Sequence, residues 1–280
     1  MFEKGLLAGK RILVTGGGSG LGAAMGRRFL ELGADLVICG RRRELLEQTA
    51  AVFRGDPGGK ISTFVCDIRD PAAVDAMMDA IWHDRAIDVL VNNAAATFVA
   101  QTEHLSPRAA DAILAPTLHG TLYCTLAAGK RWIEDHHRGV VLSILSTSTV
   151  TGRAFTVPSA MAKSAVLAMT KSLAVEWGPK GVRTVAIAPG PFPTAGATGQ
   201  LRPEGRDDGA KRNPLGRVGD HVELANLASF LISDQGGYIN GEMVVQDGGA
   251  HLRSSGAEDL LQWTDAQWEK LRASRQKDRG

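Results

Sequence analysis

Short apolar runs alternate with helical segments along this chain, and this alternation constrains its fold more than any other feature. The apolar runs stand at residues 11–15, 35–39, 61–66, 89–91, 139–144, 183–188 and 242–245. Helices are predicted between them at 22–32, 44–53, 71–82, 109–136, 159–177 and 222–232. Near-continuous apolar strands separated by helices are typical of a parallel sheet covered on both faces. The sequence therefore predicts a doubly wound α/β protein.

Length and composition limit the possible partners. The chain has 280 residues, which fits one large α/β domain. Its 32 basic and 30 acidic residues leave a net charge of +2, so the whole chain offers no case for nucleic acid or an anionic membrane. The N-terminus lacks the apolar stretch of a signal peptide, and no run approaches the roughly 20 apolar residues of a membrane helix. We expect a cytoplasmic protein that binds neither membrane nor nucleic acid.

The cysteines predict core packing rather than chemistry. Cys39, Cys66 and Cys124 are odd in number and scattered, with no metal-binding spacing and no disulfide framework. We expect them to be buried as small hydrophobic residues, and we expect no metal.

Two stretches interrupt the rhythm of strands and helices. Pro191 to Gly219 is rich in Gly, Pro and Arg, and we expect it to form a mobile substrate loop. It follows a strand whose carboxyl end belongs to the edge where open α/β sheets bind ligands. The other stretch is the polar tail 250–280, which extends a single domain spanning 1–280.

A glycine-rich segment, Thr15 to Gly22, follows the first strand and opens the first helix. Glycines at such a turn let the backbone approach a pyrophosphate, and the helix N-terminus supplies N–H donors. The alternative is a tight turn without a ligand. The candidate dinucleotide-binding residues here are Gly16, Gly18, Ser19, Gly20, Leu21 and Gly22.

The end of the second strand indicates which dinucleotide is bound. An NAD-binding protein usually places a carboxylate there, whereas this chain has Gly40 followed by Arg41, Arg42 and Arg43. A guanidinium can bind a 2′-phosphate in a bidentate manner. We therefore expect NADP(H), with Arg41 as the best candidate and Arg42 and Arg43 open to a second interpretation as a solvated helix start.

Further cofactor contacts are expected after the other strands. An acidic side chain after the third strand is a candidate acceptor for the adenine amino group, and small residues after the fourth would lie against the adenosine. A Pro-Gly pair after the sixth strand would lie against the nicotinamide, with a threonine near the phosphates. These candidates are Asp67 with Ile68, then Asn93, Ala94 and Ala95, and finally Pro189, Gly190 and Thr194.

Together these residues resemble the short-chain dehydrogenase/reductase family. The resemblance covers nearly the whole chain and includes residues 15–22, Asp67, 92–95, Ser146, Lys163, 189–194 and the closing segment 246–249. It implies a single Rossmann domain with a central parallel sheet of about seven strands, helices on both faces and, usually, a homotetramer.

One residue of the family pattern is missing. The family keeps a Tyr-x-x-x-Lys motif, but Ser159 stands four residues before Lys163, and neither Tyr123 nor Tyr238 lies near. A serine hydroxyl is a far weaker acid than a phenol, so an ordinary ketone reductase would lack its proton donor. The surrounding segment resembles the 2,4-dienoyl-CoA reductase subgroup, as do residues 105–107, 173–178, 216–219, 223–228 and 263–268.

The resemblance implies reduction of an unsaturated acyl-CoA. Hydride would go to a carbon of a conjugated diene, and charge would spread to the thioester oxygen as a dienolate. Such a site needs donors for an oxyanion more than a strong acid at the carbon that accepts hydride. Lys163 would bind the nicotinamide ribose and set the electrostatics.

Two donors of the subgroup are exchanged in this chain. Ser148 stands where mitochondrial-type members have a tyrosine, and His119, before Gly120, stands where they have an asparagine. A histidine can donate or relay a proton near neutral pH, which makes His119 a candidate replacement. The alternative is a packed or solvated histidine. Three serines are weaker candidate donors, with small loop residues as their alternative interpretation: Ser146, Ser148 and Ser159.

Three functions remain open from the sequence. The first is an NADP-dependent 2,4-dienoyl-CoA or enoyl-CoA reductase; the second is a dehydrogenase acting on another carbonyl or alcohol; the third is a non-catalytic NADP-binding relative. An acyl-CoA partner would favour a basic rim, for which the sequence offers Arg202, Arg206, Lys211 and Arg212.

Overall fold

A seven-stranded parallel sheet forms the centre of the molecule, in the order β3-β2-β1-β4-β5-β6-β7. The computed structural model describes residues 2–54, 59–196, 209–210, 213–253 and 258–277. The strands are β1 (Arg11–Thr15), β2 (Asp35–Gly40), β3 (Ile61–Val65), β4 (Val89–Asn92), β5 (Gly139–Ile144), β6 (Val182–Pro189) and β7 (Met243–Gln246). The predicted Rossmann-type α/β fold is confirmed.

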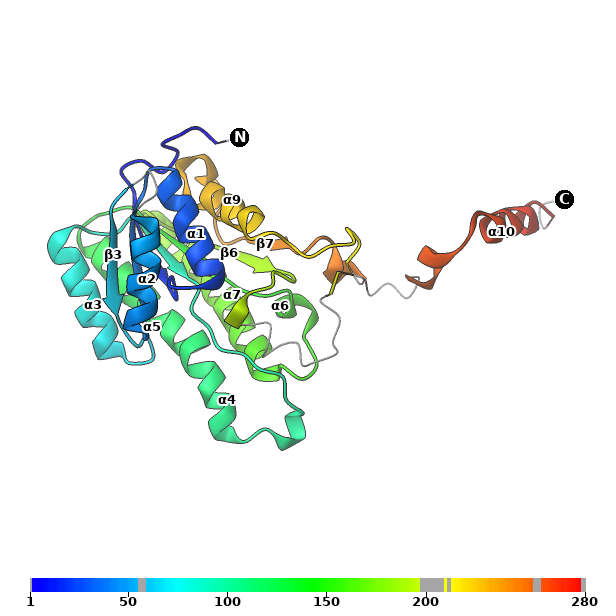
Figure 1. Cartoon of the computed structure of the whole chain (residues 1–280), viewed down its shortest axis with the longest axis horizontal. Helices are drawn as coiled ribbons and strands as arrows, with labels where there is room; N and C mark the ends of the chain where they lie inside the picture. The colour runs from blue at the N-terminus through cyan, green and yellow to red at the C-terminus, as the bar shows by residue number, and fades with distance from the viewer. Residues whose placement is uncertain (1, 55–58, 197–208, 211–212, 254–257, 278–280) are drawn as a thin grey trace.

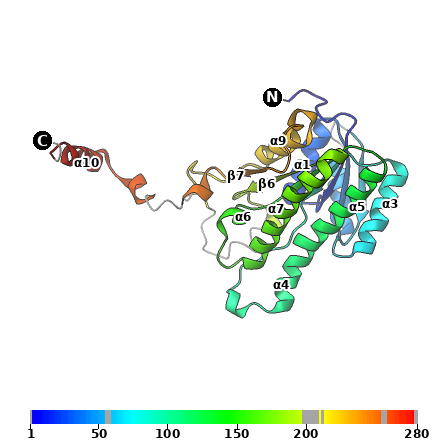
Figure 2. The same cartoon turned by 180° about the vertical axis from the view of Figure 1, so that it is seen from behind.

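Helices cover both faces of the sheet (Figures 1 and 2). The α-helices of the described residues are α1 (Gly20–Glu31), α2 (Arg43–Phe53), α3 (Pro71–Asp84), α4 (Pro107–Leu114), α5 (Gly120–Glu134), α6 (Ser148–Thr151), α7 (Val157–Trp177), α9 (His221–Ile232) and, apart from the sheet, α10 (Asp265–Lys277). Short 3₁₀ turns are η1 (Thr102–His104), η3 (Gly178–Lys180), η4 (Asp234–Gly236), η5 (Ala250–Leu252) and η6 (Glu258–Gln262).

The core consists of two main layers, one on each face of the sheet. Ile12 and Val14 of β1 pack with residues of α1 and α9, whereas Leu13 points to the other face and packs with residues of α3 and α5. Successive strand residues point to opposite faces, so a fully apolar strand supplies both layers. The three cysteines, Cys39, Cys66 and Cys124, are buried in the second layer, as predicted.

The predicted helix 109–136 is not one continuous α-helix, and that prediction was wrong in this respect. The structure has α4, then a π-helical turn η2 (Ala115–His119), then α5. Pro116 lies inside this turn and has no backbone N–H to donate to the preceding turn. A π-helical turn widens the helix locally and accommodates the missing hydrogen bond. His119 is the last residue of this irregular turn.

The order in which strands are added changes direction between β1 and β4. From β1 the chain adds β2 and β3 on one side of the sheet, and it then returns to add β4 to β7 on the other side. The loops after these strands diverge there and leave a crevice at the carboxyl edge of the sheet. At the C-terminus, α10 lies apart from the sheet in both views (Figures 1 and 2). Within the described ranges, none of the helices combines the length and apolar character needed to cross a lipid bilayer.

Candidate cofactor and active site

The glycine turn after β1 is closed by contacts that leave no room for side chains. Gly16 has φ +65°, and a Cβ atom there would lie 3.1 Å from the Cα of Ala94. A Cβ atom at Gly22 would lie 2.5 Å from the Nδ2 of Asn93 and 2.6 Å from the carbonyl oxygen of Gly16. That Nδ2 donates a 3.0 Å hydrogen bond to the carbonyl oxygen of Thr15. The turn and the start of the loop after β4 therefore form one rigid backbone cradle.

The N-terminus of α1 is available to an anion. Ser19 is its N-cap residue, but its side chain makes no capping hydrogen bond, whereas Asp70 and Ser106 cap α3 and α4 in the usual way. The first N–H groups of a helix need a partner, and a pyrophosphate can provide one. Thr194, after β6, lies over this turn, since a Cβ at Gly20 would be 3.3 Å from its Cγ2. The cradle, with Gly18 and Leu21 in the same turn, fits a dinucleotide.

The end of β2 presents cationic side chains to the same crevice. Arg41 is exposed directly after β2, whereas Arg43 pairs with Glu47 along α2 at 3.8 Å. Asp67 accepts hydrogen bonds from Arg69 at 2.9 and 2.5 Å, and these bonds lower the pKa of its carboxyl group, with a smaller contribution from Arg41. The predicted adenine acceptor is therefore already in an ion pair.

The remaining predicted cofactor residues line the crevice between β4 and β6. The Thr15 hydroxyl accepts hydrogen bonds from the backbone N–H groups of Asn93 at 3.0 Å and Ala94 at 3.1 Å. Ala95 is the exposed residue that follows. Ile68 is buried against Gly120, and Pro189 and Gly190 are partly buried at the end of β6. These positions agree with a cofactor lying across the carboxyl edge of the sheet.

Among the predicted catalytic residues, Lys163 is the one that is both ionisable and deeply buried. Only 7% of it is exposed, and its Nζ donates a 2.5 Å hydrogen bond to the carbonyl oxygen of Ile144 at the end of β5. Burial disfavours the charged ammonium and lowers the pKa of Lys163 to about 8. Its charge is therefore sensitive to whatever group binds beside it.

The serines form a small hydroxyl cluster near that lysine. The Ser148 hydroxyl donates to the Ser146 Oγ at 3.1 Å, and the backbone N–H of Ser148 donates to the same oxygen at 3.3 Å. Ser148 is buried, so the space of a loop tyrosine is closed by a small residue. Ser159 lies one helical turn before Lys163 on α7, and residues spaced by four share a helix face. The structure thus brings Ser146 and Ser148 together just after β5, to whose last carbonyl Lys163 is bonded, and Ser159 shares a helix face with Lys163.

His119 is exposed at the end of the π-helical turn. Its ring stacks on Tyr123 with centroids 6.3 Å apart, and it is not packed into the core. Two residues earlier, the buried Thr117 hydroxyl accepts from the Ala96 N–H at 3.1 Å and donates to the Ala96 carbonyl at 3.2 Å. This pair of bonds holds the turn against the loop after β4, and His119 follows two residues later on an exposed part of the helix.

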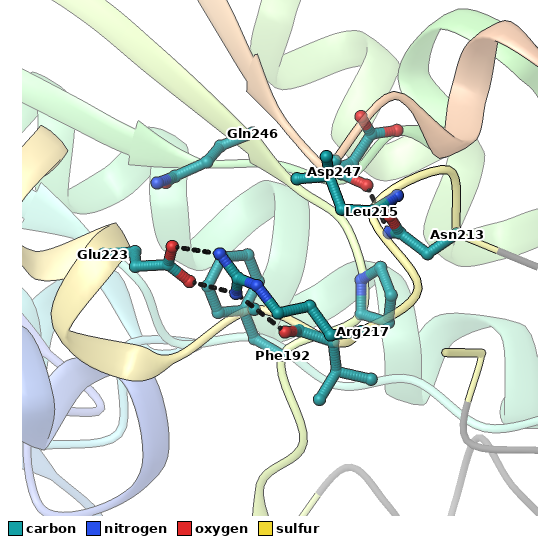
Figure 3. Close-up of a pocket in the computed structure, with 11 residues that line it drawn as sticks. Phe192, Asn213, Leu215, Arg217, Glu223, Gln246 and Asp247 are labelled. Carbon is teal, nitrogen blue, oxygen red and sulfur yellow. Dashed lines mark hydrogen bonds and ion pairs between the residues drawn. The ribbon is translucent and has the colours of Figure 1, made fainter. Parts of the chain in front are cut away.

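A further pocket, which the sequence did not predict, lies at the end of β7 (Figure 3). It has a volume of about 110 Å³. Arg217 pairs with Glu223 across it at 2.7 Å, and the Asn213 Nδ2 donates to the Asp247 carbonyl at 2.7 Å. These contacts anchor the returning end of the predicted substrate loop.

The basic residues predicted for CoA, Arg202, Arg206, Lys211 and Arg212, lie outside the described residues. Within the described ranges, no group of three or more His, Cys, Asp or Glu side chains could hold a metal ion.

Comparison with known families agrees with this site. Residues 16–251 match the family model described as Enoyl-(Acyl carrier protein) reductase. The chain belongs to the short-chain dehydrogenase/reductase family. It is an oxidoreductase of that family, and the matched region begins at the glycine turn and ends beyond β7.

Individual relatives are similar over most of their length. A probable 2,4-dienoyl-CoA reductase 3 of Caenorhabditis elegans is 42% identical, over 96% of this chain and 90% of the relative. A probable 2,4-dienoyl-CoA reductase of Bacillus subtilis is 40% identical, over 87% and 97%. Among solved structures, a putative 2-deoxy-D-gluconate 3-dehydrogenase of Agrobacterium tumefaciens with bound NADP has a TM-score of 0.81 at 31% identity, over 90% and 100%.

Proposed function

We propose that this chain reduces 2,4-dienoyl-CoA or enoyl-CoA thioesters with NADPH. The observation that carries the proposal is a buried Lys163 retained beside the cofactor crevice while serines occupy both positions where a phenol would be expected, Ser159 and Ser148. A carbonyl reductase needs a strong donor at the oxygen, whereas a conjugated thioester needs only oxyanion stabilisation there. The names of the relatives from C. elegans and B. subtilis support the same substrate class.

The proposed mechanism assigns separate tasks to the two sides of the site. NADPH, when bound, supplies the hydride for a conjugated carbon of the diene. Ser146 and Ser159 would donate hydrogen bonds to the thioester oxygen as negative charge develops on it. Lys163 would bind the nicotinamide ribose, and its ammonium adds positive potential in a site of low dielectric constant. Ser148 orients the Ser146 oxygen through the 3.1 Å hydrogen bond.

A proton must then reach the carbon skeleton of the dienolate. We assign its donation to His119, directly or through one water, because the residue is exposed to solvent and a histidine can donate a proton near neutral pH. The stacking of its ring on Tyr123 limits the orientations that the imidazole can take.

The choice of NADPH over NADH rests on the end of β2. No carboxylate stands at residues 40–43, and the exposed Arg41 is available to a 2′-phosphate. Arg69 is already paired with Asp67, which leaves Arg41 as the cation proposed for the 2′-phosphate. The NADP bound by the Agrobacterium relative supports the same cofactor.

We also propose a cytoplasmic homotetramer that acts in fatty acid β-oxidation, with 1–280 as one domain, 191–219 as its substrate loop and 250–280 as a C-terminal extension. Exposed apolar side chains on α7 support assembly, because Val157, Met161 and Val175 are 36%, 58% and 80% exposed. Light scattering on the purified protein would test the tetramer directly.

The deciding experiment follows NADPH oxidation with trans-2,trans-4-dienoyl-CoA esters and, in parallel, simple ketones. Turnover of the thioesters and not the ketones is the expected result. Turnover of ketones alone would replace the proposal with a carbonyl reductase. Binding of NADPH with turnover of neither class would leave a nucleotide-binding protein without this activity.

A further inference from the structure

Phe155 has a backbone conformation that its side chain disfavours. Its φ is +65°, and the only other non-glycine residue with positive φ in the described part of the chain is His136. A bulky residue is strained in this region, because its Cβ crowds the neighbouring backbone. Phe155 is also 54% exposed, so burial in the core does not account for an aromatic residue here.

The strain arises from a tight turn between α6 and α7. The backbone N–H of Thr156 donates to the Arg153 carbonyl at 3.4 Å, which makes Phe155 the third residue of a four-residue turn. A turn with positive φ only at its third residue strongly favours glycine there. Glycine would therefore adopt this backbone conformation with less strain. We expect the phenylalanine side chain itself to have a role that offsets the strain.

The surroundings of Phe155 are those of the proposed active site. Its carbonyl accepts a 2.9 Å hydrogen bond from the N–H of Ala100, in the loop that Thr117 fixes to the π-helical turn before His119. Four residues after Phe155, α7 presents Ser159. The strained turn therefore joins the elements that carry the donors on both sides of the crevice.

Apolar surface is open on either side of this turn. Val150 on α6 is 58% exposed, and Val157 at the start of α7 is 36% exposed. Val157 stands two residues before Ser159, which turns it by about 200° to the opposite face of the helix, away from Lys163. Phe155 precedes the helix, and its carbonyl is bonded to the loop after β4, so its position adjoins both that loop and the start of α7.

We infer that Phe155 determines acyl-chain specificity: its ring forms an apolar wall for the part of the chain beyond the diene. This inference rests on the proposed function and deepens it, because it names the part of the substrate that the mouth of the site recognises. An aromatic wall removes methylene groups from water, and each buried methylene contributes to binding. The wall should therefore act on long acyl chains and leave short ones nearly unaffected.

The test compares two substrates in three proteins. The kcat/KM for trans-2,trans-4-decadienoyl-CoA and for trans-2,trans-4-hexadienoyl-CoA is measured in the wild type, in Phe155→Gly and in the control His136→Gly. His136 has φ +51° in an exposed turn after α5, so its replacement relieves the same kind of strain away from the site. Phe155→Leu keeps apolar bulk and provides a second variant should glycine impair folding.

We expect Phe155→Gly to lose about tenfold in the decadienoyl-to-hexadienoyl ratio of kcat/KM, mostly through KM. Its melting temperature should not fall, and Phe155→Leu should keep most of the ratio. His136→Gly should leave the ratio unchanged. An unchanged ratio in Phe155→Gly, or equal losses with both thioesters, would overturn the inference while the wild-type turnover still supports the proposed function. A wild type that reduces neither thioester would overturn both.

Discussion

The two halves of the crevice achieve their geometry in different ways. The cofactor half, around β1, β2 and β4, is shaped by backbone atoms: glycines approach Asn93 and Ala94 so closely that a Cβ would collide. The catalytic half, around β5 and α7, is shaped by side chains, namely a buried lysine and hydroxyl groups that hydrogen-bond to one another. Both lie at the same edge of one sheet, so the difference reflects how each half makes contact with its ligand.

This difference determines which half can change. A backbone cradle admits almost no substitution, because any side chain enters space that another part of the main chain occupies. A side-chain site can exchange one donor for another while the helices and strands stay in place. The family resemblance implies such an exchange of donors here, with serine in place of tyrosine at positions 148 and 159 while Lys163 is kept. The predictions below test whether the two halves really differ in this way.

The largest effect is expected from Gly22→Ala in the cofactor half. The new Cβ would lie 2.6 Å from the Gly16 carbonyl oxygen, which is backbone and cannot move aside cheaply. We expect a loss of about 2–4 kcal/mol in the free energy of unfolding, typical of overpacking a rigid site, and at least about 100-fold weaker NADPH binding. Urea denaturation and fluorescence titration measure the two losses.

Gly18→Ala is the matched control for stability. A Cβ at Gly18 would meet side-chain atoms of Leu46 at 3.3 Å and Leu45 at 3.4 Å, and its nearest backbone atom would be the Leu46 N at 3.6 Å. We expect a stability change below about 1 kcal/mol. Equal destabilisation by the two alanines would show that the cradle is not limited by the close approach at Gly22.

The next effect concerns the charge of Lys163 and its dependence on pH. Burial lowers the pKa of Lys163 to about 8 in the folded chain, from 10.5 when unfolded. Between these values the unfolded state binds the extra proton, so the lysine makes the wild type more stable as pH rises. Relative to Lys163→Met, we expect the free energy of unfolding of the cofactor-free wild type to rise by roughly 3 kcal/mol from pH 7.5 to pH 10.5.

Urea denaturation of both proteins at a series of pH values gives this difference. The buried thiols, whose pKa values are raised, affect both proteins alike and cancel. The lost hydrogen bond to the Ile144 carbonyl adds an offset that does not vary with pH. Parallel stability curves would mean that Lys163 is solvated in the folded chain.

The sequence predicts the strands and the glycine turn well, and the reasons are physical. Strands without polar alternation and a glycine turn at Thr15–Gly22 are local patterns, and the structure has both. The role of the arginine after Gly40 stays a prediction. The catalytic half depends on contacts that are distant in sequence. The bond from Ala100 to Phe155 and the pocket at the end of β7 follow no local pattern. The irregular turn at Pro116 was missed because periodicity alone continued through it.

A smaller, selective effect is expected from Arg41→Ala. If its guanidinium binds the 2′-phosphate, NADPH binding should weaken by about 10- to 100-fold, the range of a charge-assisted hydrogen bond, and NADH binding should hardly change. Arg43→Ala is the control, because that guanidinium pairs with Glu47 on α2. Isothermal titration with both cofactors decides the matter, and equal losses for NADPH and NADH would remove the phosphate assignment.

The smallest effect is expected from His119→Ala, because it belongs to the half in which donors are exchangeable. The residue is exposed, so water can take over part of its task, and we expect kcat to fall by about tenfold rather than by the larger factors of enclosed acids. NADPH affinity should be unchanged, because the cradle lies in the other half. Added imidazole should restore part of the turnover of this variant.

His104→Ala removes another exposed histidine, on η1, and should neither lose activity nor respond to imidazole. Full activity in His119→Ala would leave His119 a solvated residue at the end of a kinked helix, and the proton would then come from bulk water.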